Sequence, residues 1–192
     1  MEQRDRKAAL RRSVRDARRS LPTPERRQAS EAIAARLRLL PELLTARVVL
    51  VYAASTTEVD IEDAAEGLRS RGVRTLYPRV DGEDLDLVPV SRIEELVDGH
   101  RGIREPTGLA ADPSIVDAVV VPGLAFDLRG WRLGQGGGHY DRLLPRIGDA
   151  LRIGVAFTCQ VVPQVPRDAH DIAMDLLVTE RSVHRFERLE PA

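Results

Sequence analysis

The chain has 192 residues, of which 43% are hydrophobic. That length supports one compact domain over residues 1–192 and leaves no room for two full-sized domains. No stretch approaches the roughly 18 consecutive apolar residues of a membrane span, and the first residues lack the apolar run of a secretion signal. We therefore expect a soluble, cytoplasmic protein with no membrane partner. The single cysteine, Cys159, excludes an internal disulfide and a multi-thiolate metal site; because it follows the apolar run IGVAFT, we expect a buried, inert thiol.

The charge is unevenly distributed along the chain. The net charge is −1, but residues 1–38 hold twelve Arg or Lys and five Asp or Glu, a balance of +7. Such an arm can attract nucleic acid, bind another polyanion, or pack as a solvated helix face against acidic neighbours, which is the commonest case. The arm has no interleaved aromatic residues, and only 4% of the chain is aromatic, so platforms for stacking bases are few. We expect no nucleic-acid partner.

The amino-terminal third is predicted to be helical. Helix-forming residues predict a basic helix at about 3–20, whose narrow apolar stripe needs the rest of the protein to cover it. A second helix is predicted after LPTPE, with Thr23 as its N-cap and Pro24 at its first helical position. It is expected to run to about Leu40.

Short apolar runs then alternate with polar helical stretches. The predicted strands are RVVLVYAA, VRTLYP, DLVPV, AVVVPGLAF, RIGVAF and DLLVTE, and DIEDAAEGLRSRG is a predicted helix between the first two. The capping box SRIE after DLVPV predicts a further helix. Continuous β-branched runs between helices are typical of a mainly parallel sheet with both faces covered. We therefore predict an α/β fold, a three-layer Rossmann-like sandwich with helices on both faces.

The stretch RLGQGGGHYDRLL, residues 132–144, follows a predicted strand and precedes a predicted helix. Ligands of such sheets bind beyond the carboxyl ends of the strands, and consecutive glycines expose backbone amides that suit a phosphate. The nucleoside-triphosphate P-loop does not match, because His139 and Tyr140 follow Gly138, and the dinucleotide fingerprint fails because His139 replaces its third glycine. A carboxylate at Asp141 favours a phosphate ligand that carries Mg²⁺, whereas a plain surface turn is the alternative.

The runs VVVPGLAFDLRGWRLGQGGGHYDRLL, TTEVDIED and HDIAMDLLVTE together resemble the 5-formyltetrahydrofolate cyclo-ligase family, also called methenyltetrahydrofolate synthetases. The resemblance runs from the Lys7 segment to about Glu180. It implies a ligase that uses ATP and Mg²⁺ to close 5-formyltetrahydrofolate to 5,10-methenyltetrahydrofolate, with ADP and phosphate as products. The formyl oxygen would be phosphorylated, which turns it into a leaving group for attack by nitrogen 10. One departure is His139, where family members often have a tyrosine.

The resemblance also implies roles for individual residues. Lys7 and Asp141 would be catalytic, Ala53 and Glu58 would bind the folate, and Asp141 and Asp175 would hold Mg²⁺. ATP would be bound by Lys7, Arg11, Arg132, Leu133, Gly134, Gln135, Gly136, Gly137, Gly138, His139 and Tyr140. Without the resemblance, Asp175 reads as a solvated residue entering a strand, and Glu58 as a loop glutamate beside a helix cap. We expect small-molecule substrates, and a monomer or weak homo-oligomer.

Two further observations bear on function. Of 29 basic residues only Lys7 is lysine, and the chain has no asparagine. This bias makes Lys7 a candidate for a role that arginine cannot fill. The alternative is that a lysine codon has survived at this position by chance. Lys7 and Arg11 are four residues apart, so both can reach one polyphosphate from the same helix face.

Other enzymes with an α/β architecture, such as a sugar-phosphate isomerase or an enzyme that handles acyl-CoA, remain alternatives that a glycine-rich loop alone does not exclude.

Overall fold

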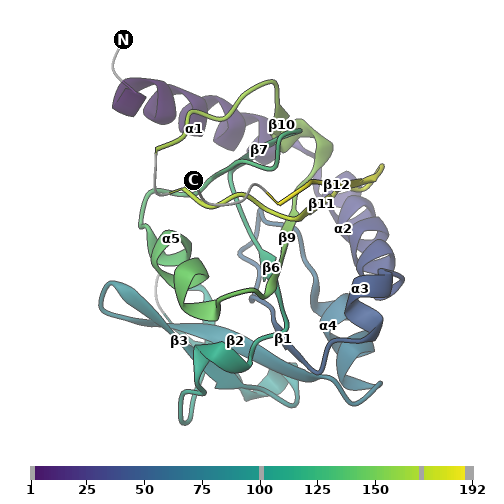
Figure 1. Ribbon diagram of the computed structural model, residues 1–192. Coiled ribbons are helices and arrows are strands. Elements are labelled where there is room, and N and C mark those ends of the chain that lie inside the picture. The colour runs from purple at the N-terminus through teal and green to yellow at the C-terminus, as the bar shows by residue number, and fades with distance from the viewer. Residues whose placement is uncertain (1–2, 100–101, 169–170, 189–192) are drawn as a thin grey trace.

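The computed structural model describes residues 3–99, 102–168 and 171–188. Its centre is a seven-stranded sheet in the order β12-β11-β9-β6-β1-β2-β3 (Figure 1). The strands are β1 (Val48–Leu50), β2 (Arg74–Asp81), β3 (Asp84–Pro89), β6 (Ala118–Val121), β9 (Leu151–Val155), β11 (Leu176–Val178) and β12 (Val183–Arg185). Neighbours from β11 to β2 are parallel, and the two edge strands pair antiparallel. The predicted α/β class with a mainly parallel sheet is confirmed.

Helices cover the sheet from both sides, as Figure 1 shows with α2, α3 and α4 on one side and α5 on the other. The α-helices are α1 (Gln3–Ser20), α2 (Thr23–Arg38), α3 (Pro41–Leu44), α4 (Glu62–Arg69) and α5 (His139–Leu143). The 3₁₀ turns are η1 (Ile93–Glu95), η3 (Pro113–Ile115), η4 (Leu144–Ile147) and η5 (Thr158–Gln160). Among the described helices, none combines the length and apolar character needed to cross a membrane.

The apolar core is split by the sheet into two clusters. On one side, Ile33 and Leu37 of α2 and Leu68 of α4 pack against alternate residues of the strands. On the other side, Leu143 and Ile147, from α5 and η4, pack against the remaining strand residues. Every residue of β6 is buried, as expected for a strand covered on both faces. This is why the apolar runs in the sequence are continuous and do not alternate.

Two smaller sheets extend the structure around the central one. One has the order β10-β7-β8, with β7 (Ala125–Asp127), β8 (Arg132–Leu133) and β10 (Val161–Val162), and α1 packs on it through the buried Val14. The other is the antiparallel pair β4 (Leu96–Asp98) and β5 (Arg104–Pro106). The glycine-rich stretch starts in β8, so the small sheet fixes where that stretch leaves the core.

Three local predictions were wrong. The N-cap of α2 is Pro22, one residue before Thr23, and it makes no side-chain capping bond. The SRIE box opens only the 3₁₀ turn η1, because the chain enters β4 directly after Glu95, whose carboxylate accepts the Ser91 and Arg92 amides. Cys159 is exposed in η5, although partial desolvation raises the pKa of its thiol.

Candidate active site

The glycine-rich stretch separates two cavities at the carboxyl ends of the parallel strands. The sheet cavity, about 310 Å³, is bordered by Tyr52 and Ala53 just after β1 and by Pro122 and Gly123 just after β6. The helix cavity, also about 310 Å³, lies between α1 and the same stretch. Both cavities are lined by Arg132, Gly134, Gly138 and Asp141. A ligand in one cavity is therefore separated from a ligand in the other only by this shared wall.

The glycines of this wall are required by its backbone conformation at two positions. Gly136 has φ 110° and Gly138 has φ 71°, a region that residues with a side chain rarely adopt. A Cβ at Gly136 would lie 3.8 Å from the Arg11 guanidinium, and a Cβ at Gly138 would lie 2.6 Å from Arg142. Gly137 has no positive φ, so the left-handed constraint belongs to its two neighbours. The helix that follows, α5, has only five residues and adds little helix dipole.

Basic side chains of α1 form the opposite wall of the helix cavity. The Lys7 Nζ donates to Asp168 at 2.7 Å and to Asp171 at 2.9 Å, and Arg11 Nε donates to the Gly134 carbonyl at 3.0 Å. Partial burial lowers the pKa of Lys7, but the bonds to the two carboxylates outweigh it, so the pKa is raised. Lys7 therefore stays protonated, and two cations from one helix face meet the glycine-rich stretch.

Asp141 belongs to both cavities. Its Oδ1 accepts a hydrogen bond from Arg132 Nη2 at 2.5 Å, and about a third of its side chain is exposed. Arg132 itself is buried, and its guanidinium also lies over the Tyr140 ring at 5.6 Å. A carboxylate held by a buried guanidinium beside a glycine-rich wall is well placed to meet a metal ion that arrives with a phosphate.

Asp175, the second predicted metal ligand, lies elsewhere. It immediately precedes β11, and Asp175 N donates to the Arg152 carbonyl near the amino end of β9, the edge of the sheet opposite the cavities. Its carboxylate accepts from Arg188 at 2.8 and 3.0 Å and from Arg152 N at 2.7 Å. It lines neither cavity. The structure therefore places Asp175 away from Asp141: its carboxylate holds the chain after β12 against the sheet. In the helix cavity, Asp141 has other acidic neighbours.

Those neighbours are an acidic pair that the sequence reasoning missed. Asp168 and Asp171 line the helix cavity with Asp141 and Lys7. The signal was present in the segment RDAHD, where two carboxylates three residues apart stand a few residues before Asp175 and the strand that follows it. Within the described residues no group of three or more His, Cys, Asp or Glu is disposed to hold a metal ion. Two carboxylates facing a phosphate pocket nevertheless suit Mg²⁺, which keeps water and phosphate oxygens as its other ligands.

The sheet cavity contains the other predicted binding residues. Glu58 and Ala53 line it together with Gln135, His139 and Tyr140. Glu58 Oε2 accepts from Ser55 N at 3.0 Å, and Oε1 accepts from Gln135 Nε2 at 2.9 Å. Glu58 lies in the loop between β1 and α4, as the alternative of a loop glutamate expects, but only 9% of its side chain is exposed and it is held by Gln135 of the glycine-rich wall. Leu133 is buried against α1 and borders the helix cavity.

Tyr140 contributes a second polar group to the sheet cavity. Its hydroxyl is buried and has no hydrogen-bond partner in the described part of the chain, and burial raises its pKa. A buried hydroxyl normally has a partner, so this group is available to a ligand. His139 occupies the cavity wall where the family pattern often has a tyrosine.

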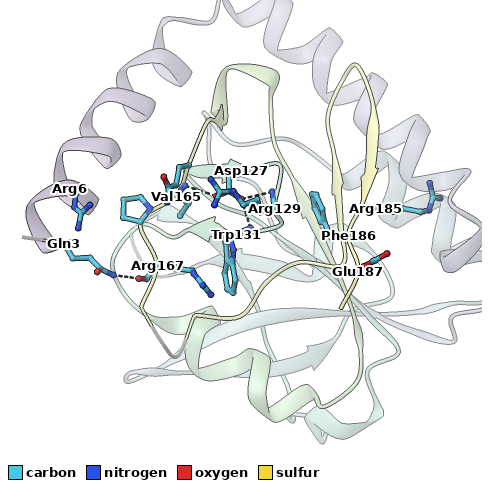
Figure 2. Close-up of a pocket in the computed structure, with 12 residues that line it drawn as sticks. Gln3, Arg6, Asp127, Arg129, Trp131, Val165, Arg167, Arg185, Phe186 and Glu187 are labelled. Atoms are coloured by element: carbon cyan, nitrogen blue, oxygen red, sulfur yellow. Dashed lines mark hydrogen bonds between the residues drawn. The ribbon is translucent and has the colours of Figure 1, made fainter. Parts of the chain in front are cut away.

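A third cavity, lined by Asp127, Trp131, Val165 and Arg167 among others, is larger, about 620 Å³ (Figure 2). Its buried carboxylate, Asp127, accepts from the amides of Arg129, Trp131 and Val165 at 2.9–3.1 Å. Arg167 lies over the Trp131 ring at 4.3 Å, and these two side chains lie close together in Figure 2. The polar groups here hold loops together, and none of the glycines at 134–138 lines this cavity.

Comparisons with known proteins identify the family of the chain. A family model described as the 5-formyltetrahydrofolate cyclo-ligase family matches residues 3–180. The cyclo-ligase of Escherichia coli K12 is 30% identical over 178 residues, covering 88% of this chain and 98% of that protein. The cyclo-ligase of Mycolicibacterium smegmatis is 31% identical over 185 residues, covering 91% and 94%.

Solved structures support the same assignment. The NMR structure of Aquifex aeolicus 5,10-methenyltetrahydrofolate synthetase superimposes with a TM-score of 0.85 at 39% identity, covering 97% of this chain and 95% of that one. A Mycoplasma pneumoniae structure of the same name shares the fold, with a TM-score of 0.76 at 23% identity, covering 91% and 98%. Sequence, fold and cavities thus lead to one conclusion: the chain is an enzyme of the ligase class and belongs to the 5-formyltetrahydrofolate cyclo-ligase family.

Proposed function

We propose that this protein converts 5-formyltetrahydrofolate to 5,10-methenyltetrahydrofolate with ATP and Mg²⁺, releasing ADP and phosphate, and that the formyl oxygen is phosphorylated on the way. The observation that carries the proposal is the pair of cavities that share Arg132, Gly134, Gly138 and Asp141 as a common wall. A reaction that moves a phosphoryl group from one substrate to another needs two adjoining sites.

The helix cavity suits the polyphosphate of ATP. Lys7 and Arg11 supply positive charge from α1, and Gly134 and Gly136 add backbone without side chains of their own, with Arg132 and Arg11 beside them. Arg132 adds a buried guanidinium at the boundary with the sheet cavity. Fixed cations around a transferring phosphoryl group stabilise its negative charge, so these residues would accelerate the transfer by position and charge.

The sheet cavity suits the folate. Glu58 is an ionisable acceptor that can take two parallel hydrogen bonds from the amino-pyrimidine edge of a pterin. Pro78, Val80 and Leu85 form an apolar wall of the same cavity and can contact the flat ring system. Ala53 borders this space with a small side chain, which leaves room for a ring.

The chemistry needs activation of a poor leaving group. In 5-formyltetrahydrofolate the formyl group is an amide, whose oxygen leaves poorly. Its oxygen attacks the γ-phosphorus and displaces ADP; nitrogen 10 then attacks the formyl carbon, phosphate leaves, and the proton on nitrogen 10 is released. Both steps depend on placing the reacting atoms together and on neutralising charge, for which Arg132 and Lys7 are suited.

The Mg²⁺ that accompanies ATP would be held by Asp141 and Asp171, in place of the Asp141–Asp175 pair suggested by resemblance. Both line the helix cavity, and each is now paired with a cation, Arg132 and Lys7 respectively. When bound, the ion neutralises phosphate charge. Arg132 and Lys7 then orient the two carboxylates from behind, as partners of metal ligands commonly do.

The test is a direct assay with purified protein. 5-Formyltetrahydrofolate, ATP and Mg²⁺ together should give the ultraviolet absorbance of methenyltetrahydrofolate, and omitting either ATP or Mg²⁺ should abolish it. An enzyme that acts on sugar phosphates or acyl-CoA would produce no methenyl absorbance. Absence of product from folded protein in the complete mixture would reject the proposal.

A further inference from the structure

Arg18 is a buried arginine on α1 that the proposed chemistry does not use directly. Only 4% of the residue is exposed, although its neighbours Arg15 and Arg19 reach solvent. In the described part of the structure its Nε and Nη1 atoms are buried without a hydrogen-bond partner. It lines neither cavity. A buried cation with unsatisfied donors calls for a functional explanation, because such groups are normally paired.

The anion nearest to Arg18 is Glu58. Arg18 Nη1 lies 4.0 Å from Glu58 Oε1, and the two side chains are 5% and 9% exposed. Among the described residues no other carboxylate lies within 4.0 Å of this guanidinium. Glu58 Oε1 already accepts from Gln135, and Oε2 accepts from the Ser55 amide. Arg18 therefore approaches from α1 a carboxylate whose two oxygens are already fixed in direction.

Stability alone does not account for an arginine here. One turn earlier on the same helix face, Val14 packs with Ala125, Leu133 and Val165. An apolar pair in place of Arg18 and Glu58 would serve stability as well, because replacing both members of a buried ion pair by apolar groups is often neutral or stabilising. Burial lowers the pKa of Arg18, the main cause being loss of solvation, yet arginine remains charged.

We propose that Arg18 is a positioning residue for folate binding. This proposal rests on the proposed function: the buried guanidinium is the counter-ion of Glu58 and keeps its carboxylate at the wall of the sheet cavity, where it can accept hydrogen bonds from the pterin. The same helix carries Lys7 and Arg11 to the helix cavity. The single helix α1 thus supplies positive charge near both proposed substrate sites. Because Arg18 reaches Glu58 only when α1 is packed on the rest of the protein, the packing of α1 should affect folate binding.

The experiment uses Arg18→Met, with Arg18→Lys as the charge-conserving variant and Arg12→Met, an exposed position on α1, as the matched control. For Arg18→Met we expect KM and Kd for 5-formyltetrahydrofolate to rise roughly tenfold or more, because a buried carboxylate loses its counter-ion. We expect kcat and the KM for ATP to change by less than about threefold, and the melting temperature to fall, because the Glu58 carboxylate is left without its counter-ion. Arg18→Lys should recover much of the folate affinity, and Arg12→Met should resemble the wild type.

A double-mutant cycle with Glu58→Gln isolates the pair. In the Glu58→Gln background, Arg18→Met should have little further effect on folate affinity, because the negative charge that Arg18 faces is already absent. The inference is overturned by an Arg18→Met protein with wild-type folate affinity or by an equal loss in the Glu58→Gln background. If Arg18→Met does not fold, a folded Arg18→Lys protein decides: a change in its KM for ATP as large as the change in its KM for folate would overturn the inference. A wild type that binds 5-formyltetrahydrofolate in calorimetry but forms no methenyl product would reject the proposed function instead, while the binding comparison still decides the role of Arg18.

Discussion

Lys7 is a lysine at a position where we expect arginine to be a poor replacement. It is the only lysine in the chain, and its ammonium sits between two carboxylates at 2.7 and 2.9 Å with 12% of its side chain exposed. A compact ammonium can donate to both carboxylates and also to a phosphate oxygen, whereas a planar guanidinium is larger and fixed in its fork. The composition bias that singled out Lys7 is thus matched by a place where its size matters.

We therefore predict that Lys7→Arg lowers activity although it conserves charge. The loss in kcat/KM for ATP should be roughly tenfold or more, because the larger group displaces Asp168 and Asp171 or blocks the phosphate. Arg12→Lys, at an exposed position of the same helix, is the control and should leave activity unchanged. Steady-state kinetics at saturating folate and varied ATP measure both. Wild-type kinetics for Lys7→Arg would mean that the lone lysine is a chance survivor.

Asp141 gives a second prediction at this scale. Asp141→Asn keeps the shape and the contact to Arg132 but loses the negative charge, so turnover should fall on the order of a hundredfold and more Mg²⁺ should be needed. Titration of Mg²⁺ in the cyclisation assay checks it. Asp171→Asn should raise the Mg²⁺ requirement as well, since it lines the same cavity. An unchanged requirement in both variants would move the metal to other residues.

Asp175 is the matched contrast to these two aspartates. Asp175→Asn weakens its paired hydrogen bonds to Arg188, so we expect a loss of about 1.5–3 kcal/mol in the free energy of unfolding. Its Mg²⁺ requirement should remain that of the wild type. Denaturant unfolding and metal titration separate the two effects. A raised Mg²⁺ requirement in a fully stable Asp175→Asn protein would restore it as a metal ligand.

At the scale of elements, the glycine-rich wall yields a prediction about shape. Gly136→Val should abolish measurable ATP binding, because φ 110° is hostile to a branched residue and its Cβ would project toward Arg11. Gly82→Val, in the turn between β2 and β3, also has a positive φ but open space around it. It should lose comparable stability, about 1–2 kcal/mol, while keeping ATP affinity. Calorimetry compares the affinity of the two variants for ATP. Equal ATP affinity in both would mean that the glycine-rich stretch is a turn that takes no part in ATP binding.

The elements also show which sequence signals were sufficient. Continuous apolar runs identified the parallel strands β1, β6 and β9. A strand that is covered on both faces needs apolar residues at successive positions, and such a run can be recognised in the sequence. The SRIE box did not make a helix, since a cap supplies hydrogen bonds at a helix end but no apolar face to pack. Thr23 was placed one residue off, a typical error for helix ends.

For the molecule as a whole, the part of the candidate site that is contiguous in sequence could be proposed from the sequence. The residues that only the fold brings together could not. The glycine-rich stretch and Asp141 are contiguous in sequence and were identified together. Asp171, only four residues before Asp175, was missed because sequence alone does not show which carboxylate turns toward the glycines and which binds Arg188. Arg18 was likewise invisible, since its burial depends on how α1 docks.

The proposed reaction requires that a phosphoryl group pass from ATP in the helix cavity to the formyl oxygen in the sheet cavity. The most direct test uses 5-formyltetrahydrofolate labelled with ¹⁸O in the formyl group, incubated with ATP, Mg²⁺ and the protein, followed by mass analysis of the phosphate released. We expect the label to appear in inorganic phosphate, one atom for each methenyltetrahydrofolate formed. Methenyl product accompanied by unlabelled phosphate, with the label released to water, would contradict it.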